Sequence, residues 1–143
     1  MHIGFEWLQN SSKLLVWQQF CTILQEKLNG AHEIDEFYYQ ILDSCATKWQ
    51  NMNSKRIALE ALILLLEKEG KLDLSNKCYV CRQNIVDSVS FAKGFAQVHP
   101  SCIHSSSFNK EHIDELLLNK TTIYLNDTNI DKLWGLALQG FAN

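Results

Sequence analysis

Four residues in the middle of the chain have the types and the spacing of metal ligands. Cys78 and Cys81 form one Cys-x-x-Cys pair, and His99 and Cys102 form a second pair with the same gap. Such a gap lets both side chains of one turn reach the same tetrahedral ion, and residues 82–98 are long enough for a hairpin that brings the turns together. Three thiolates and one imidazole leave no coordination position open. We therefore expect a structural Zn²⁺ site and not a catalytic one.

The fourth ligand has a second candidate nearby. His104 lies shortly after Cys102 and could supply the imidazole in place of His99. The gap between His99 and Cys102 repeats the geometry of the first pair, which favours His99. The other cysteines, Cys21 and Cys45, lie on apolar stripes of expected helices, where a small buried side chain is common. We do not expect them to bind metal.

Residue patterns for other chemistry are missing from the sequence. A redox Cys-x-x-Cys pair needs a preceding strand in a βαβ setting, and no such alternation precedes Cys78. The zinc deaminase signature is absent, because Pro100 is followed by Ser101 and no His has Glu two positions later. Neither a Gly-rich phosphate loop nor a Gly-x-Ser-x-Gly motif occurs. We expect no catalytic residues, no small-molecule substrate and no enzymatic activity.

Apolar residues at helical intervals predict three helices before the ligand pairs. The first follows the capping residues Asn10-Ser11-Ser12 and extends to about residue 28, and the second covers about residues 33–49. Residues 51–54, Asn-Met-Asn-Ser, end the second helix and cap the third, which ends at Gly70, a residue suited to the C′ position of a helix. Because its middle is apolar nearly all round, we expect this helix to be buried.

The pattern changes to short strands between the ligand pairs. Residues 86–91 and 95–98 are strand-like runs joined by Ala92-Lys93-Gly94, a turn in which glycine supplies positive φ. Farther along, Asn109 can cap a helix that extends through residue 118. Residues 128–131 match a capping box, which predicts a last helix.

Length and composition agree with a mainly α fold in one domain. The chain has 143 residues, 46% of them hydrophobic and 20% charged, as in ordinary globular proteins. We predict a helical bundle over residues 1–143 with a zinc-knuckle β-hairpin inserted at residues 75–104. The start of the chain lacks a signal peptide pattern, and the most apolar run, residues 57–66, is shorter than the roughly 20 residues that span a bilayer. We expect a cytoplasmic protein with reduced cysteines and no membrane association.

Charge limits the contacts that the chain can make with nucleic acid. The net charge of −3 argues against a wholly basic nucleic-acid binder. Lys77, Arg82 and Lys93 surround the expected knuckle, and they are the best candidates for contacts with phosphate groups. Zinc-bound thiolates would offset part of their charge, so we expect only weak contact with DNA.

The knuckle and the segments around it resemble the C-terminal helical, zinc-binding domain of bacterial RecO. The likeness is especially close to the divergent RecO proteins of Helicobacter and Campylobacter relatives, and it extends from about Phe5 to Phe141. The segments that carry it are Trp17-Gln-Gln-Phe20, Asp35-Glu-Phe-Tyr38, Cys78-Tyr-Val-Cys81, Ser90-Phe-Ala-Lys-Gly-Phe95, and Gly94-Phe95 through Cys102-Ile-His-Ser105.

This resemblance implies a non-enzymatic mediator of DNA recombination and repair. Members of that family bind DNA, anneal complementary strands, and associate with RecR and with single-strand-binding protein; their zinc-binding domain follows an OB-fold. The strand pattern of an OB-fold is not found in this sequence, so we expect the chain to correspond to the C-terminal part of such a protein or to a truncated relative. Its own DNA binding should then be weak and salt-sensitive. The alternative interpretation is an unrelated zinc-ribbon domain that docks protein partners and binds no DNA.

Overall fold

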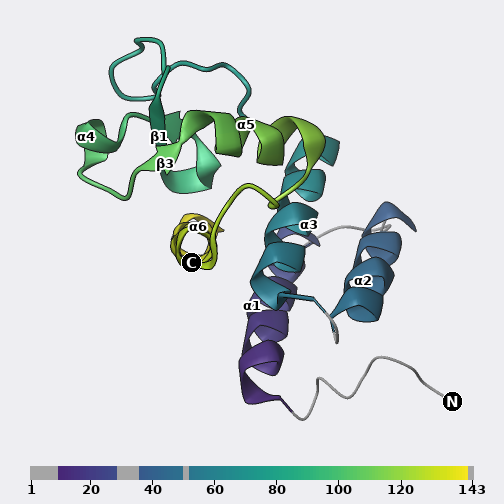
Figure 1. Ribbon diagram of the computed structural model, residues 1–143. Coiled ribbons are helices and arrows are strands. Elements are labelled where there is room, and N and C mark those ends of the chain that lie inside the picture. Colours follow the sequence, from purple (N-terminus) through teal and green to yellow (C-terminus); the bar gives the residue numbers. More distant parts are fainter. Residues whose placement is uncertain (1–9, 29–35, 50–51, 142–143) are drawn as a thin grey trace, which may run out of the picture. The chain divides into compact units, whose positions relative to one another are not determined.

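The computed structural model of the chain describes residues 10–28, 36–49 and 52–141 (Figure 1). The chain divides into two compact units, residues 1–62 and 63–143, and the boundary between them falls within the third helix. The mainly α fold with an inserted hairpin is confirmed. The expectation that the whole chain forms one domain stays a prediction. No helix in the described ranges is long and apolar enough to cross a membrane.

Helices make up the described part of the first unit. They are α1 (Ser11–Leu28), α2 (Glu36–Lys48) and the first part of α3 (Ser54–Lys68). Asn10 caps α1, because its Oδ1 accepts a hydrogen bond from the Lys13 N–H at 3.1 Å. Asn53 caps α3 in the same way, with the Lys55 N–H as donor at 3.0 Å. The three predicted helices are confirmed, and the expected start of the second at about residue 33 lies outside the described residues.

Trp49, just after α2, joins the helices of the first unit and is fully buried. Its indole N–H donates to the Lys13 carbonyl at 3.0 Å, and the Lys13 ammonium donates to the Trp49 carbonyl at 2.9 Å. The ring of Trp17 meets that of Trp49 edge to face, with the centroids 4.9 Å apart. These contacts make both tryptophans structural residues of the first unit.

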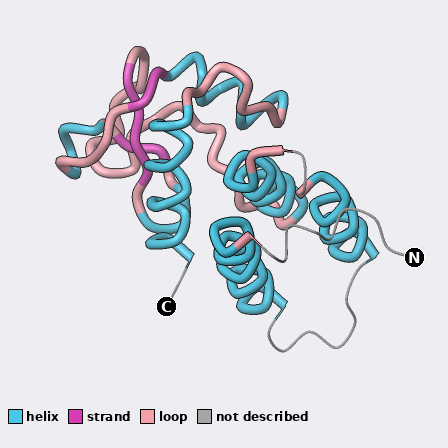
Figure 2. Tube along the Cα trace, turned by 60° about the horizontal axis from the view of Figure 1, so that its bottom comes forward, coloured by secondary structure: helices cyan, strands magenta, loops and turns pink. Residues whose placement is uncertain are grey.

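A small antiparallel sheet lies in the second unit, drawn in magenta in Figure 2. Its strands, in the spatial order β2-β1-β3, are β1 (Ser88–Phe91), β2 (Gln97–Val98) and β3 (Phe108–Asn109). Ser90 on β1 lies opposite Val98 on β2, and Val89 lies opposite Phe108 on β3. The predicted hairpin is confirmed with shorter strands. The third strand was not predicted, because two residues are too few to show an alternating pattern.

The turn between β1 and β2, the short 3-10 segment η2 (Lys93–Phe95), uses the left-handed backbone region twice. Gly94 has φ +76°, as the sequence predicts, and the next residue, Phe95, has φ +64°. A bulky side chain is rare in this region. The Phe95 ring is buried and stacks on the Phe91 ring with the centroids 4.1 Å apart, so packing offsets the backbone strain.

The described part of the second unit also contains the helices α4 (Pro100–Ile103), α5 (Lys110–Asn119) and α6 (Asp127–Phe141). Asn109 caps α5 as predicted, because its side chain accepts hydrogen bonds from two N–H groups of the first turn. The predicted capping box at residues 128–131 is wrong. The cap of α6 is Asn126, whose Oδ1 accepts from the Asn129 N–H at 2.8 Å. Several consecutive residues here are good caps, and only the hydrogen bond distinguishes them.

The cap of α5 gives a test of this fold. Replacing Asn109 with Ala removes the acceptor for the first-turn N–H groups and should lower the free energy of unfolding by about 1 kcal/mol. Asn109→Asp keeps an oxygen acceptor and should retain most of the stability. Urea unfolding followed by circular dichroism measures both variants. Equal losses in the two variants would mean that the Asn109 side chain does not stabilise the helix as a cap.

Candidate metal centre

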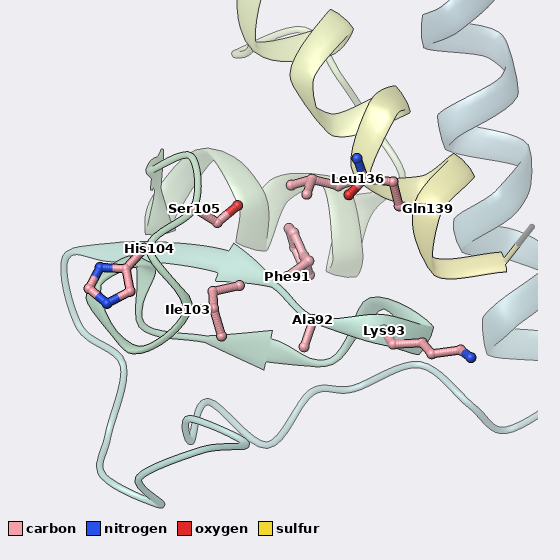
Figure 3. Close-up of a pocket in the computed structure, with 8 residues that line it drawn as sticks. All are labelled: Phe91, Ala92, Lys93, Ile103, His104, Ser105, Leu136 and Gln139. Carbon is pink, nitrogen blue, oxygen red and sulfur yellow. The ribbon is translucent and has the colours of Figure 1, made fainter.

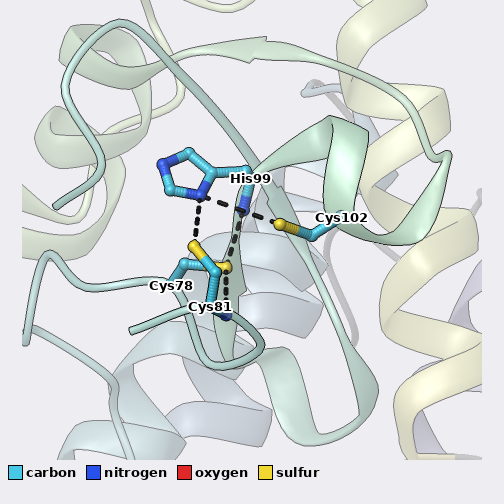
Figure 4. Close-up of side chains that lie close together, drawn as sticks. All are labelled: Cys78, Cys81, His99 and Cys102. Carbon is cyan, nitrogen blue, oxygen red and sulfur yellow. Dashed lines mark hydrogen bonds between the residues drawn. The ribbon is translucent and has the colours of Figure 1, made fainter. Parts of the chain in front are cut away.

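The four ligands predicted from the sequence meet in the second unit (Figure 4). The sulfur atoms of Cys78, Cys81 and Cys102 and a ring nitrogen of His99 all lie within 4.8 Å of one another. The Nδ1 atom of His99 is 3.2 Å from the Cys81 sulfur and 3.9 Å from the Cys102 sulfur. These four residues, the Cys3His group, could hold a metal ion. No other such group occurs in the described ranges.

The separations within the Cys3His group suit a tetrahedral metal ion. With metal–sulfur bonds of about 2.3 Å and a metal–nitrogen bond of about 2.0 Å, a sulfur and a nitrogen of a tetrahedron lie about 3.5 Å apart. The two distances from the His99 nitrogen, 3.2 and 3.9 Å, lie on either side of this value. The donors also fit, because thiolates and imidazole together are typical of closed structural sites.

Backbone hydrogen bonds shape the turn that carries the first ligand pair. The Cys78 N–H donates to the Gln83 carbonyl at 2.9 Å, and the Arg82 N–H donates to the Cys78 carbonyl at 2.9 Å. Arg82 has φ +67°, a left-handed conformation that closes the turn directly after Cys81. The turn leaves Cys78 buried and Cys81 exposed.

The second ligand pair comes from the junction of β2 and α4. Pro100 begins α4, where its missing N–H costs no helical hydrogen bond. His99 is the N-cap residue with extended backbone, and the Cys102 N–H donates to the His99 carbonyl at 3.0 Å. One turn of helix therefore sets the spacing between His99 and Cys102.

A backbone carbonyl fixes the orientation of the His99 ring. The Nε2 atom lies 3.0 Å from the carbonyl oxygen of Asn84. Because a carbonyl can only accept, Nε2 is the donor in this contact, which leaves Nδ1 as the nitrogen that faces the thiols and could bind a metal ion. Metal-binding histidines commonly donate their second N–H in this way. Asn84 acts through its backbone, so its residue type could not have indicated the role.

Hydrogen bonds and burial set different pKa values within the group. The Cys78 sulfur accepts from the N–H groups of His99 at 3.3 Å and Cys81 at 3.5 Å. Burial raises the pKa of the Cys78 thiol, but the backbone N–H groups together outweigh burial and lower it to about 6. At Cys102, burial and the two neighbouring cysteines all raise the pKa of the thiol, to about 11. A metal ion must therefore displace the proton of Cys102 in order to bind.

Cys21 and Cys45 lie outside the Cys3His group. Cys45 is buried in α2, where burial raises the pKa of its thiol to about 12. Burial also raises the pKa of the Cys21 thiol. Within the described ranges, neither thiol belongs to a group of Cys, His, Asp or Glu side chains close enough together to share an ion, so neither has the companion ligands that a metal site requires.

His104 lies away from the thiols. It follows α4 with left-handed backbone, φ +52°, and lines a cavity of about 420 Å³ (Figure 3). Figure 3 shows Phe91 and Ile103 between His104 at one end of this cavity and Lys93 at the other. The structure thus brings His99, and not His104, to the three cysteines.

The three basic residues expected to contact phosphate line two different cavities. Lys93 lines the cavity of Figure 3, whereas Lys77 and Arg82 line a second cavity beside the first cysteine pair. All three residues are exposed. Lys71 and Tyr79 also line the second cavity. The sequence gives little indication that Lys71 lines this cavity, because several residues separate it from the cysteine turn.

Comparison with known proteins does not assign the chain to a family. No protein-family model matches it, and no curated protein matches it either. What the site can do must follow from its geometry. Four protein ligands would complete a tetrahedral shell and leave no position for water or a substrate, so the group can tie two chain segments together around an ion, the cysteine turn and the junction of β2 and α4.

Metal content should separate the ligands from their neighbours. We expect about one metal ion per chain in protein purified without added metal, and its loss in both Cys78→Ser and His99→Ala, because each change opens the tetrahedral shell. Two matched controls, Cys45→Ser and His104→Ala, should retain the ion. Elemental analysis of the purified variants measures this. Retention in His99→Ala with loss in His104→Ala would assign the imidazole ligand to His104.

Metal affinity should rise with pH. The pKa of the Cys102 thiol is raised to about 11, so the thiol is protonated at neutral pH and must lose a proton when the metal binds. Each proton displaced strengthens the apparent affinity about tenfold per pH unit. Between pH 7 and pH 8 we therefore expect an increase of at least about tenfold, measured by competition with a chelator of known affinity. An affinity independent of pH would contradict the thiolate assignment.

Proposed function

We propose that this chain is a non-enzymatic module of DNA repair and homologous recombination, similar to the C-terminal domain of RecO, with a structural zinc ion. The observation that carries the proposal is the Cys3His group, with its ligand atoms within 4.8 Å, on a mainly α scaffold. Cys78, Cys81, His99 and Cys102 hold the ion. A closed shell favours a role in folding and in contacts with partners over a role in catalysis.

Zinc is the ion that the donors favour. Thiolate sulfur selects soft or borderline metals, and the addition of one imidazole suits Zn²⁺ in a tetrahedral shell. Hard cations such as Mg²⁺ and Ca²⁺ prefer oxygen ligands, which the Cys3His group lacks. The ion stabilises the hairpin, because the free energy of metal binding at such a site is also folding free energy.

Protein contacts dominate the proposed function. The resemblance to RecO supports RecR and single-strand-binding protein as partners in the cytoplasm. Lys77, Arg82 and Lys93 are exposed and able to contact phosphate, but they are few, so DNA binding by this chain is weak. The module then works mainly by docking on partners that themselves hold DNA.

One observation favours the alternative, a zinc-ribbon domain that docks proteins and never contacts DNA. Three apolar side chains in the first ligand pair's turn and shortly after it in the sequence are exposed: Tyr79 by 60%, Val80 by 53% and Val86 by 72%. Exposed apolar side chains of this size are common at protein interfaces. Both candidate functions use the metal to fix a surface, and they differ in whether DNA is a ligand.

Binding measurements with purified partners test the proposal. We expect the metal-loaded chain to associate with RecR or single-strand-binding protein of the same organism in size-exclusion chromatography with light scattering. We also expect weak binding to single-stranded DNA that is largely lost by about 200 mM salt. Lack of association with either protein, for a folded and metal-loaded chain, would contradict the mediator role. Association without any DNA binding at low salt would support the alternative.

A further inference from the structure

A cavity beside the first cysteine pair is rich in positive charge. It has a volume of about 370 Å³, and Lys71, Lys77, Arg82 and Tyr79 are among the residues that line it. This volume lies at the small end of the range of about 300 to 1,000 Å³ that ligand sites span. The cavity is distinct from the Cys3His group, although Cys78 lines both.

The positive charges of this cavity are not neutralised by ion pairs. In the described part of the chain, no carboxylate forms an ion pair with Lys71, Lys77 or Arg82. Asp73 is the acidic residue of the cavity, and its carboxylate is already hydrogen-bonded by neutral donors. Its Oδ1 accepts from the Ser75 hydroxyl at 2.7 Å, and its Oδ2 accepts from the Gln97 N–H at 2.9 Å.

A net positive charge remains after the neighbouring negative charges are counted. Three thiolates and a neutral imidazole around a divalent ion carry a net charge of about −1. Together with the Asp73 carboxylate, they offset two of the three positive charges of Lys71, Lys77 and Arg82. The cavity can therefore accept one further anionic group, such as a phosphodiester.

An aromatic ring stands beside these cations. Tyr79 is 60% exposed, and the Arg82 guanidinium lies 5.3 Å from the centroid of its ring. An exposed ring next to phosphate-binding cations is the arrangement by which proteins bind single-stranded nucleic acid, with a base stacked on the ring. A duplex fits poorly, because its bases are already stacked on one another and cannot reach a side chain in this way.

We propose that this cavity binds one nucleotide of single-stranded DNA, with its phosphate among Lys71, Lys77 and Arg82 and its base against Tyr79. The choice of DNA over RNA rests on the proposed function. The metal supports this site, because Tyr79 lies between two ligands and the Arg82 N–H donates to the carbonyl of Cys78. Both side chains therefore project from the turn that the metal holds.

Fluorescence anisotropy with a labelled oligothymidylate tests the proposal at low salt. We expect Tyr79→Ala to weaken binding about tenfold through lost stacking, and Tyr79→Phe, its matched control, to bind like the unchanged chain. Lys77→Ala should weaken binding and lower the slope of log affinity against log salt by about one. Lys132→Ala removes an exposed lysine of α6 that does not line the cavity, and it should have little effect. Metal content is measured for each variant, so that weaker DNA binding caused by loss of the metal ion can be recognised.

Several outcomes would overturn this site. One is that Tyr79→Ala, with metal retained, binds the oligonucleotide as tightly as the unchanged chain does. Another is that Lys132→Ala weakens binding as much as Lys77→Ala, which would mean that any surface cation contributes equally. Tighter binding of duplex DNA or of oligouridylate would reject single-stranded DNA as the ligand. Partner association is measured separately, so a chain that binds RecR with no cavity-dependent DNA binding refutes this site alone.

Discussion

Four side chains able to bind one metal ion lie in the second unit, with their ligand atoms within 4.8 Å of one another. Its strands are short, with four residues in β1 and two each in β2 and β3, so the sheet itself contributes few hydrogen bonds. The four side chains come from two segments, the cysteine turn and the junction of β2 and α4. An ion bound to all four would cross-link segments that the short sheet holds with few hydrogen bonds, and its binding free energy would add to the stability of the unit.

Polar contacts also fix the segment that precedes the first cysteine, residues 73–76. The carboxylate and the carbonyl of Asp73 accept hydrogen bonds from Gln97 on β2. A few residues later, Asn76 accepts from the ammonium group of Lys110, which is only 4% exposed and also pairs with Asp114. A buried lysine needs such partners, because an unpaired charge away from water is costly. The segment that leads into the cysteine turn is therefore fixed at both ends by side chains of the sheet and of α5.

The sequence was most informative where residue type and spacing are tied to one chemical purpose. The cysteine pairs predicted the group of ligands, and apolar periodicity predicted the long helices. It was least informative where the deciding contact is made by the backbone or by distant parts of the chain. The Asn84 carbonyl has no side-chain signature, β3 is too short for a pattern, and the cap of α6 had several equivalent candidates. Lys93 lines a different cavity from Lys77 and Arg82. This placement depends on the tertiary position of the hairpin, which the local sequence does not encode.

Arg82 illustrates how such a site limits sequence change. Its backbone occupies the left-handed region at φ +67°, where glycine is favoured over other residues by about 1 kcal/mol. A glycine there would make the turn more stable, but it would remove the guanidinium beside Tyr79. Selection for thermal stability alone would therefore favour glycine at this position. Such a variant would have a more stable cysteine turn but would lack the positive charge beside Tyr79.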